Sequence, residues 1–286
     1  MYRKAERVIK KWIENSNKAL LVTGARQIGK TWLVRDEIGK SGFKIFEINF
    51  LDQPGMVNYL NAQMSAADFL VKLKMIMPEE CKPHETIVFF DEIQRCPEIM
   101  TKIKFLVEEG SFKYVMSGSL LGVELHGITS APVGYLSILK MYPMDFEEFM
   151  IANGVSRVTL DMLQERFDSR QRVDDFIHQK LMSLYFVYLI VGGMPDAVKR
   201  YIETKDIREV DRIQKDIVEL YKEGFSQYEH EDKKLKLKSI YEVVPAELNK
   251  QNKKFVFTML NKELKFDRYE NSFFLAKGSR GCDTCI

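Results

Sequence analysis

The stretch Leu20–Thr31, which reads LLVTGARQIGKT, constrains the fold of this chain more than any other part of the sequence. An apolar run leads into a loop that begins at Gly24 and closes with Lys30 and Thr31, in the spacing G-x-x-x-x-G-K-T of the phosphate-binding P-loop. Residues 31–38 follow with apolar positions near helical spacing. A buried strand, a glycine loop and a helix in this order predict a phosphate-binding segment rather than an ordinary glycine turn.

Each part of this loop has a chemical role in that interpretation. The two glycines let the backbone approach a polyphosphate closely and adopt conformations that a Cβ disfavours. We expect the Lys30 amine to reach the β- and γ-phosphates and the Thr31 hydroxyl to ligate Mg²⁺. A helix that begins near Lys30 directs its positive end toward the phosphates. The residues predicted to bind the nucleotide are Gly24, Ala25, Arg26, Gln27, Ile28, Gly29, Lys30, Thr31 and Trp32.

A second informative stretch is Thr86–Glu92, which reads TIVFFDE. Its unbroken apolar residues are typical of a strand covered on both faces, and it ends in two adjacent carboxylates. Two acids that merely cap a helix are the alternative, which the upstream P-loop disfavours. We therefore predict that Asp91, together with Thr31, binds Mg²⁺ and that Glu92 orients and activates the attacking water. Lys30 and Glu92 are accordingly predicted as catalytic residues.

The apolar stretch at residues 112–116 ends in Ser117-Gly118-Ser119. A polar side chain at the tip of this strand could sense the γ-phosphate or hold the attacking water. Ser117 and Ser119 are both candidates for that catalytic role. An ordinary Ser-Gly turn after a strand is an equally good interpretation of either serine.

Five apolar stretches, near residues 20, 45, 87, 114 and 137, are expected to be strands, and helical segments separate most of them. This alternation predicts an α/β fold with a largely parallel sheet flanked by helices. One predicted strand lies between the P-loop and Asp91, and a second acid follows Asp91. Both features favour nucleotide hydrolysis over the simpler kinase type. Residues 155–230 are expected to be helical, as is a short stretch at 235–248 that is interrupted at Pro245.

Composition excludes several classes of protein. With 45% hydrophobic and 29% charged residues the chain is typical of a soluble globular protein, and its net charge of +2 implies no general polyelectrolyte partner. The longest apolar run, residues 184–191, is far shorter than the about 20 residues of a membrane span. The charged N-terminus is not a signal peptide. These features predict a cytoplasmic protein that does not bind membranes.

The C-terminal part of the sequence is mildly basic. Residues 231–286 hold 12 basic and 8 acidic residues. This region could contact DNA or a protein partner, although a solvated lysine-rich surface is the simpler interpretation. Cys282 and Cys285 form a C-x-x-C pair without a second ligand pair, so we expect reduced thiols and no zinc site.

Five segments form a combination that is far more specific than any one motif: GARQIGKT at 24–31, FFDEIQ at 89–94, SGS at 117–119, YPMDFEEF at 142–149 and VGGMPDAV at 191–198. Together they resemble the prokaryotic AAA-type ATP-binding proteins that carry a C-terminal domain of unknown function. The resemblance covers about residues 1–270. It implies a P-loop NTPase core of the AAA-like type at residues 1–153, a helical lid region at 154–230, and the start of a winged-helix-like module at 231–286. Family members also carry a restriction-endonuclease-like module.

The chain departs from the family pattern in two places. Relatives continue well beyond the region matching residues 266–270, so we expect this chain to be truncated and to lack the nuclease-like module. Many relatives have a Gly-Arg pair before the fifth strand, where this chain has Val133-Gly134-Tyr135. The identity of an arginine finger therefore stays open. Arg26 and Arg95 are candidates for phosphate or subunit contacts, and a structural or solvated arginine is an equal alternative for each.

The leading hypothesis is an AAA-like ATPase that binds ATP and Mg²⁺ and drives a transaction with a nucleic-acid or protein partner, with a homo-oligomer as one form of assembly. A non-hydrolysing, nucleotide-dependent switch or binding module is the rival. It predicts tight ATP binding with negligible turnover. A P-loop kinase is a third reading, which the adjacent Asp91 and Glu92 disfavour. A truncated remnant without a present function is the fourth.

Overall fold

The computed structural model describes residues 1–60, 65–119, 134–225 and 231–249. Within them the chain divides into two compact units. One unit is formed by residues 5–141 together with residues from 225 onward, and the other by residues 1–4 and 142–224. The domain boundary expected at residue 153 stays a prediction.

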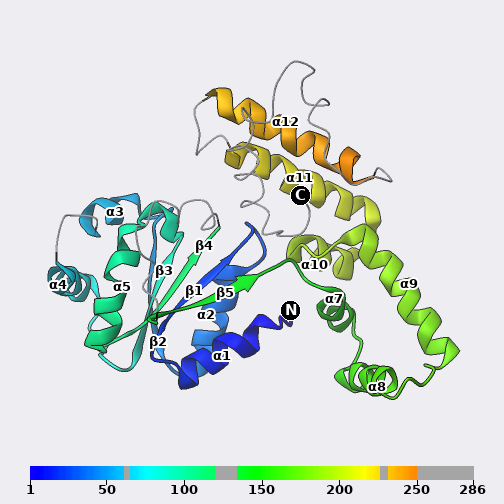
Figure 1. The fold of residues 1–286 in the computed structure, drawn as a ribbon, viewed down its shortest axis with the longest axis horizontal. Coiled ribbons are helices and arrows are strands. Elements are labelled where there is room, and N and C mark those ends of the chain that lie inside the picture. The colour runs from blue at the N-terminus through cyan, green and yellow to red at the C-terminus, as the bar shows by residue number, and fades with distance from the viewer. Residues whose placement is uncertain (61–64, 120–133, 226–230, 250–286) are drawn as a thin grey trace. The chain divides into compact units, whose positions relative to one another are not determined.

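The larger unit is built on one five-stranded sheet (Figure 1). All hydrogen-bonded strand pairs are parallel, and the strand order is β2-β3-β4-β1-β5. The predicted parallel α/β sheet is therefore confirmed. The strands are β1 (Ala19–Gly24), β2 (Lys44–Asn49), β3 (Thr86–Asp91), β4 (Lys113–Gly118) and β5 (Leu136–Met141).

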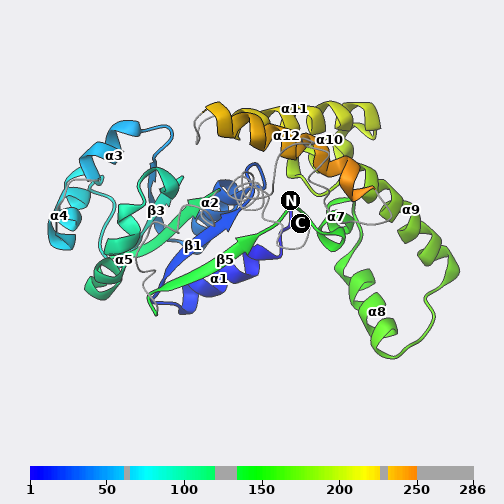
Figure 2. The same cartoon turned by 45° about the horizontal axis from the view of Figure 1, so that its top comes forward.

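Strand order decides which residues meet at the functional edge. β1 lies between β4 and β5, and β4 lies between β1 and β3. Figure 2 shows β5 beside β1. Because the strands are parallel, their carboxyl ends share one edge of the sheet, where ligands of open α/β sheets bind. Ser117 lies beside Val22 in the register, and Met116 lies beside Phe90. The end of β4 therefore lies between the P-loop, which follows β1, and Asp91, which ends β3.

In the described part of this unit five helices pack with the sheet, and a short 3₁₀ turn, η1 (Ile93–Arg95), follows β3. Alternate side chains of the strands, such as Leu21, Phe90 and Met116, share a fully buried cluster with side chains of the third, fourth and fifth helices. The first two helices contact each other and bury Ile9 and Leu33. The helices are α1 (Ala5–Asn15), α2 (Lys30–Ser41), α3 (Pro54–Leu60), α4 (Ala66–Ile76) and α5 (Glu98–Glu109).

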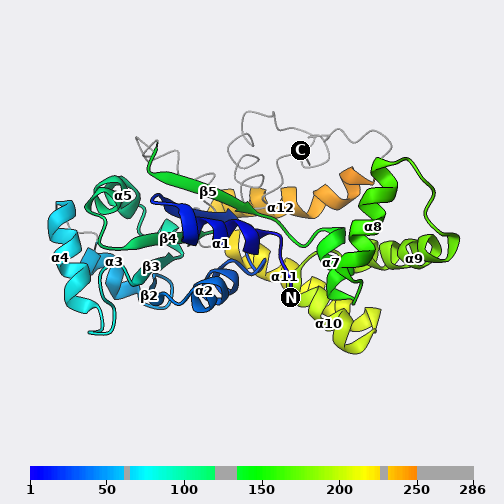
Figure 3. The same cartoon turned by 90° about the horizontal axis from the view of Figure 1, so that it is seen from below.

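The smaller unit is helical, as the sequence predicted for the region after the sheet. Its core gathers Met144, Phe149 and Val198 with other buried apolar residues. Figure 3 shows the connection between its helices α8 and α9, whose bounds are given below. Its helices are α7 (Phe146–Ala152), α8 (Arg157–Asp168), α9 (Asp175–Val191), α10 (Pro195–Thr204) and α11 (Ile207–Phe225).

Two of the sequence motifs pack against each other in the smaller unit. The Met144 N–H donates to the Gly193 carbonyl at 2.7 Å, and the Tyr188 hydroxyl donates to the Met144 carbonyl at 2.9 Å. A Cβ at Gly193 would lie 2.1 Å from the Met144 oxygen, so only glycine fits there. Motifs at residues 142–149 and 191–198 therefore form one structural element of this unit.

The N-terminal residues 1–4 hold the start of α7. Arg3 Nε lies 3.3 Å from Glu148 Oε2 with both side chains buried, and an Arg3 amino group donates to the Tyr142 carbonyl at 2.5 Å. Glu148 also completes a capping box with Asp145 and accepts the backbone N–H of Lys4 at 2.6 Å. This contact set fixes residues 1–4 to the smaller unit.

The helix at the end of the described chain differs from its prediction. We expected an interruption at Pro245, but α12 (Glu231–Leu248) runs through it. A proline removes a single backbone donor, and the ladder resumes beyond it because the Asn249 N–H donates to the Pro245 carbonyl at 3.2 Å. The rest of the expected winged-helix-like module, with Cys282 and Cys285, lies outside the described residues. No helix in the described ranges is long and apolar enough to cross a membrane.

Candidate functional site

The loop between β1 and α2 has the backbone that a phosphate cradle needs. Gly29 has a φ of 87° and Gln27 a φ of 62°, both in the left-handed region. A Cβ at Gly24 would lie 2.2 Å from the Met141 carbonyl oxygen of β5 and 2.7 Å from the Ile28 side chain. Ile28 itself is fully buried and anchors the loop. The glycine at position 24 is thus required by the close approach of β5.

The side chain of Lys30 folds back over this loop. Its Nζ donates to the carbonyl of Ala25 at 2.7 Å and to that of Gly24 at 3.1 Å. Lys30 is only 6% exposed. Burial lowers the pKa of Lys30 to about 8, although the nearby Glu92 and Asp91 carboxylates raise it. An amine in this position gains most from an anionic ligand that restores its full charge.

Thr31 and Asp91 meet at the carboxyl edge of the sheet. The Thr31 hydroxyl donates to Asp91 Oδ2 at 2.9 Å, although 60 residues separate them in the sequence. Asp91 is 2% exposed. A hydroxyl and a carboxylate held together in this way are hard oxygen donors of the kind that Mg²⁺ prefers.

Two further side chains orient the Asp91 carboxylate. The Asn49 amide, at the end of β2, donates to Oδ2 at 3.1 Å. The Ser117 hydroxyl, at the end of β4, donates to Oδ1 through a short hydrogen bond. The backbone N–H of Glu92 also donates to Oδ1 at 3.1 Å. Each carboxylate oxygen is therefore fixed from a neighbouring element, which presets its direction.

The structure separates the roles of the two candidate serines. Ser117 contacts Asp91, as described above. Ser119 is 3% exposed and accepts a hydrogen bond of 3.3 Å from the side-chain amide of Gln94, which also donates to the Glu92 carboxylate through a short hydrogen bond. Only Ser119 is thus linked to the predicted water-activating residue.

The side chains present fit a nucleotide with a bound Mg²⁺. The loop supplies a backbone cradle that a Cβ at Gly24 would fill, Lys30 supplies a buried amine, and Thr31 with Asp91 supplies hard oxygen donors. Trp32, which follows Thr31 in α2, is 51% exposed and so offers an aromatic surface. The predicted residues Gly24–Trp32, Asp91, Glu92, Ser117 and Ser119 all belong to the same unit.

Sequence reasoning missed two residues of this site, Asn49 and Gln94. Asn49 ends β2, and Gln94 lies in η1 directly after the two acids. A polar residue at the end of a neighbouring parallel strand was the available signal for Asn49. Gln94 stood in the sequence as part of the FFDEIQ motif, but its role depends on a turn that the motif alone does not specify.

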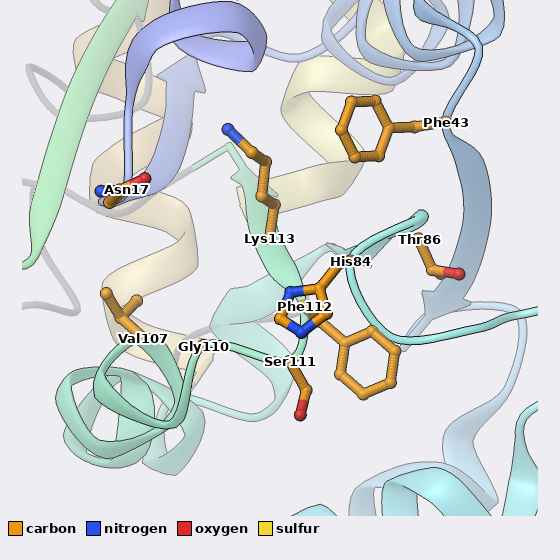
Figure 4. Close-up of a pocket in the computed structure, with 9 residues that line it drawn as sticks. All are labelled: Asn17, Phe43, His84, Thr86, Val107, Gly110, Ser111, Phe112 and Lys113. Atoms are coloured by element: carbon orange, nitrogen blue, oxygen red, sulfur yellow. The ribbon is translucent and has the colours of Figure 1, made fainter.

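An open pocket of about 370 Å³ lies at the opposite edge of the sheet (Figure 4). Thr86 and Lys113, which begin β3 and β4, line it. Lys113 Nζ donates to the carbonyls of Ile13 at 2.7 Å and Ser16 at 2.8 Å, and burial lowers its pKa. Lys113 therefore satisfies the C-terminal carbonyls of α1, and this pocket is separate from the P-loop.

Comparison with protein families identifies two regions. Residues 16–150 match the model of an AAA domain, and residues 182–276 match the model of a domain of unknown function, DUF8612. The chain therefore contains an AAA-type P-loop domain followed by a domain of unknown function, as the sequence resemblance implied. No curated protein matches the chain.

Solved structures share the fold. The chain is similar to the Walker-type ATPase PABY2304 of Pyrococcus abyssi, with a TM-score of 0.53 and 13% identity over 97% of this chain and 89% of that one. It is also similar to the RuvB Holliday junction branch migration motor of Thermotoga maritima (TM-score 0.40, 12% identity, 70% of this chain and 59% of that one). A third similar structure is C. elegans PCH-2 (TM-score 0.38, 13% identity, 73% of this chain and 65% of that one).

Proposed function

We propose that this chain binds ATP with Mg²⁺ and hydrolyses it. The observation that carries the proposal is the 2.9 Å hydrogen bond between the Thr31 hydroxyl and Asp91, made beside a P-loop whose lysine is buried. A hydroxyl, a carboxylate and an amine converge at the carboxyl edge of a parallel sheet. That arrangement suits a metal-bound polyphosphate better than any other ligand class.

In this proposal each residue has one task. The loop amides and Lys30 neutralise the charge that develops on the phosphates. Thr31 and Asp91 would hold Mg²⁺, which would help to neutralise the same charge when bound. Asn49 and Ser117 keep the Asp91 carboxylate in its direction. Glu92 orients water for in-line attack on the γ-phosphate.

Phosphate release at saturating ATP tests the proposal, with and without Mg²⁺. We expect turnover that EDTA abolishes and that Glu92→Gln reduces at least about 100-fold while ATP still binds, since removing a water-positioning group costs this much or more. Glu79→Gln, which makes the same change at an exposed residue, is the matched control. Unchanged turnover in Glu92→Gln would refute the role of Glu92.

Tight ATP binding without turnover in the wild type would instead favour the non-hydrolysing switch. We further propose that the ATPase serves a transaction with DNA or a protein partner, or between copies of the chain. The sequence feature that motivates a DNA partner is the basic region 231–286. Turnover measured with and without double-stranded DNA at low and high salt tests it, because a phosphate-mediated effect decreases as salt rises.

A further inference from the structure

We propose that Gln94 is a positioning residue for hydrolysis that couples Glu92 to Ser119, an inference that rests on the proposed ATPase function. The three side chains come from different places in the fold. Glu92 follows β3, Gln94 lies in η1, and Ser119 follows β4. One buried amide group connects the water-activating carboxylate with the hydroxyl at the tip of the next strand.

The hydrogen-bond pattern fixes which way the amide faces. Gln94 Nε2 donates both to Glu92 Oε2 and to Ser119 Oγ, the latter at 3.3 Å. The reverse orientation would place the amide oxygen against the carboxylate, so two acceptors would face each other. Gln94 is 8% exposed, and water cannot readily replace the amide in this role.

The backbone of the turn is held in an uncommon conformation. Glu92 has a φ of 56° and a ψ of 45°, in the left-handed region that non-glycine residues avoid at a cost of roughly 1–2 kcal/mol. The Arg95 N–H donates to the Glu92 carbonyl at 3.0 Å and so closes the turn. Such a conformation persists where its surroundings hold it, and it brings the side chains of residues 92 and 94 within hydrogen-bonding distance.

This arrangement assigns protons at the site. Both amide hydrogens of Gln94 are used, so Ser119 accepts one of them and keeps its own proton to donate to a phosphate oxygen. Glu92 Oε2 accepts a hydrogen bond from the other amide hydrogen of Gln94. Glu92 Oε1 then stays available to accept a hydrogen bond from water. Gln94 Oε1 is buried and has no hydrogen-bond partner among the described residues. Leaving this acceptor unpaired is costly, so the two hydrogen bonds of Nε2 are what keep the amide in this orientation.

Three variants separate positioning from folding. Gln94→Leu removes both donors with an apolar side chain of similar size, Gln94→Asn keeps the amide on a shorter stem, and Ser119→Ala removes one acceptor. We expect Gln94→Leu to lower kcat roughly 10- to 100-fold while the Kd for ATP changes less than about threefold. Gln94→Asn should recover part of kcat. Ser119→Ala should lower kcat less when it is added to Gln94→Leu than when it is made alone, because part of the contribution of Ser119 depends on Gln94.

A second readout does not depend on turnover. The two side-chain amide proton signals of Gln94, measured by NMR on the nucleotide-free protein, should exchange slowly with water. Ser119→Ala and Glu92→Gln should each shift them. If Gln94→Leu fails to fold, Gln94→Asn and Ser119→Ala carry the kinetic comparison.

The outcomes distinguish the two proposals. A wild-type protein without turnover overturns the proposed function. Normal turnover in Gln94→Leu overturns only the role of Gln94. Equal losses of kcat and of thermal stability in Gln94→Leu and Gln94→Asn would also overturn it, since that pattern indicates a structural role alone.

Discussion

The Thr31 hydroxyl donates a 2.9 Å hydrogen bond to the carboxylate of Asp91. Thr31 lies in the first turn of α2, and Asp91 is the last residue of β3. β4 lies between β1, which leads into the P-loop, and β3, so the bond spans the central part of the sheet edge. This hydrogen bond orients both groups toward each other, and the arrangement is the physical basis of the first prediction.

Thr31→Val should abolish Mg²⁺-dependent turnover, and Thr31→Ser should keep most of it. Valine has the shape of threonine but no oxygen, whereas serine keeps the hydroxyl that donates to Asp91 and ligates the metal. Phosphate release over a Mg²⁺ titration measures the difference. Equal activity of the valine and serine variants would contradict the metal-binding role of Thr31.

ATP affinity should decrease as pH rises above about 8. The pKa of Lys30 is lowered to about 8 in the folded protein, so its amine loses its charge above that pH unless phosphates stabilise the proton. Affinity should then decline by at most about tenfold per pH unit. Calorimetry between about pH 8 and pH 9.5, in buffers of different ionisation enthalpy, should show proton uptake on binding.

Lys30→Arg is the control for that experiment, because arginine keeps its charge throughout this range. It should show no proton uptake. The lowered pKa of Lys30 also affects folding stability. Between about pH 8 and the ordinary lysine value of 10.5 the unfolded chain binds more protons than the folded chain, so this residue makes the fold more stable as pH rises. A wild-type affinity that is equal at both ends of the range would contradict the role of Lys30.

Gly24→Ala should destabilise the larger unit more than Gly29→Ala. A Cβ at position 24 would lie 2.2 Å from the Met141 oxygen, so we expect a loss of about 3 kcal/mol. Position 29 has open space, and only its left-handed φ of 87° opposes alanine, at about 1–2 kcal/mol. The chain's two tryptophans, at positions 12 and 32, lie in this unit, so their fluorescence in urea measures its unfolding. Equal midpoints would contradict the close approach of β5.

Glu148→Gln should destabilise α7, and Glu147→Gln should not. Glu148 pairs with Arg3 where both side chains are buried, so its loss leaves an uncompensated charge and costs about 3–5 kcal/mol. Glu147 pairs with Lys4 on the surface, where such a bond contributes less than about 1 kcal/mol. Hydrogen exchange of the α7 amides separates the two variants, and equal protection would contradict the prediction.

The sequence predicted the parts of the site that depend on local pattern. A few consecutive residues are enough to indicate the P-loop, the strand ending in two acids, and the strand ending in Ser117. Parallel strands place their carboxyl ends at one edge of a sheet, and each of these segments lies at such a strand end. The structure brings them together in one unit.

The sequence could not predict contacts that depend on strand order or turn geometry. Asn49 reaches Asp91 because β2 pairs with β3, and no local pattern specifies that pairing. Gln94 reaches Glu92 because a left-handed residue turns the chain after β3. Likewise, Ser117 and Ser119 look equivalent in the sequence, and only the three-dimensional arrangement separates a contact to Asp91 from one to Gln94.

Pro245 shows the opposite case. Here a strong local preference predicted an interruption of the helix that the structure does not contain. Proline ends many helices because it lacks a donor and crowds the preceding turn. In α12 the backbone accommodates that loss, and the carbonyl of Pro245 still accepts the N–H of Asn249. A single unfavourable residue is outweighed when the neighbouring turns are helical.

The contact between Arg3 and Glu148 also bears on the order in which the chain can fold during synthesis. Arg3 precedes its acceptor Tyr142 by 139 residues, so it leaves the ribosome well before its partner. The larger unit's strands are all translated in between. Residues 1–4 therefore reach their contacts in the smaller unit only after all five strands of the larger unit have been synthesised.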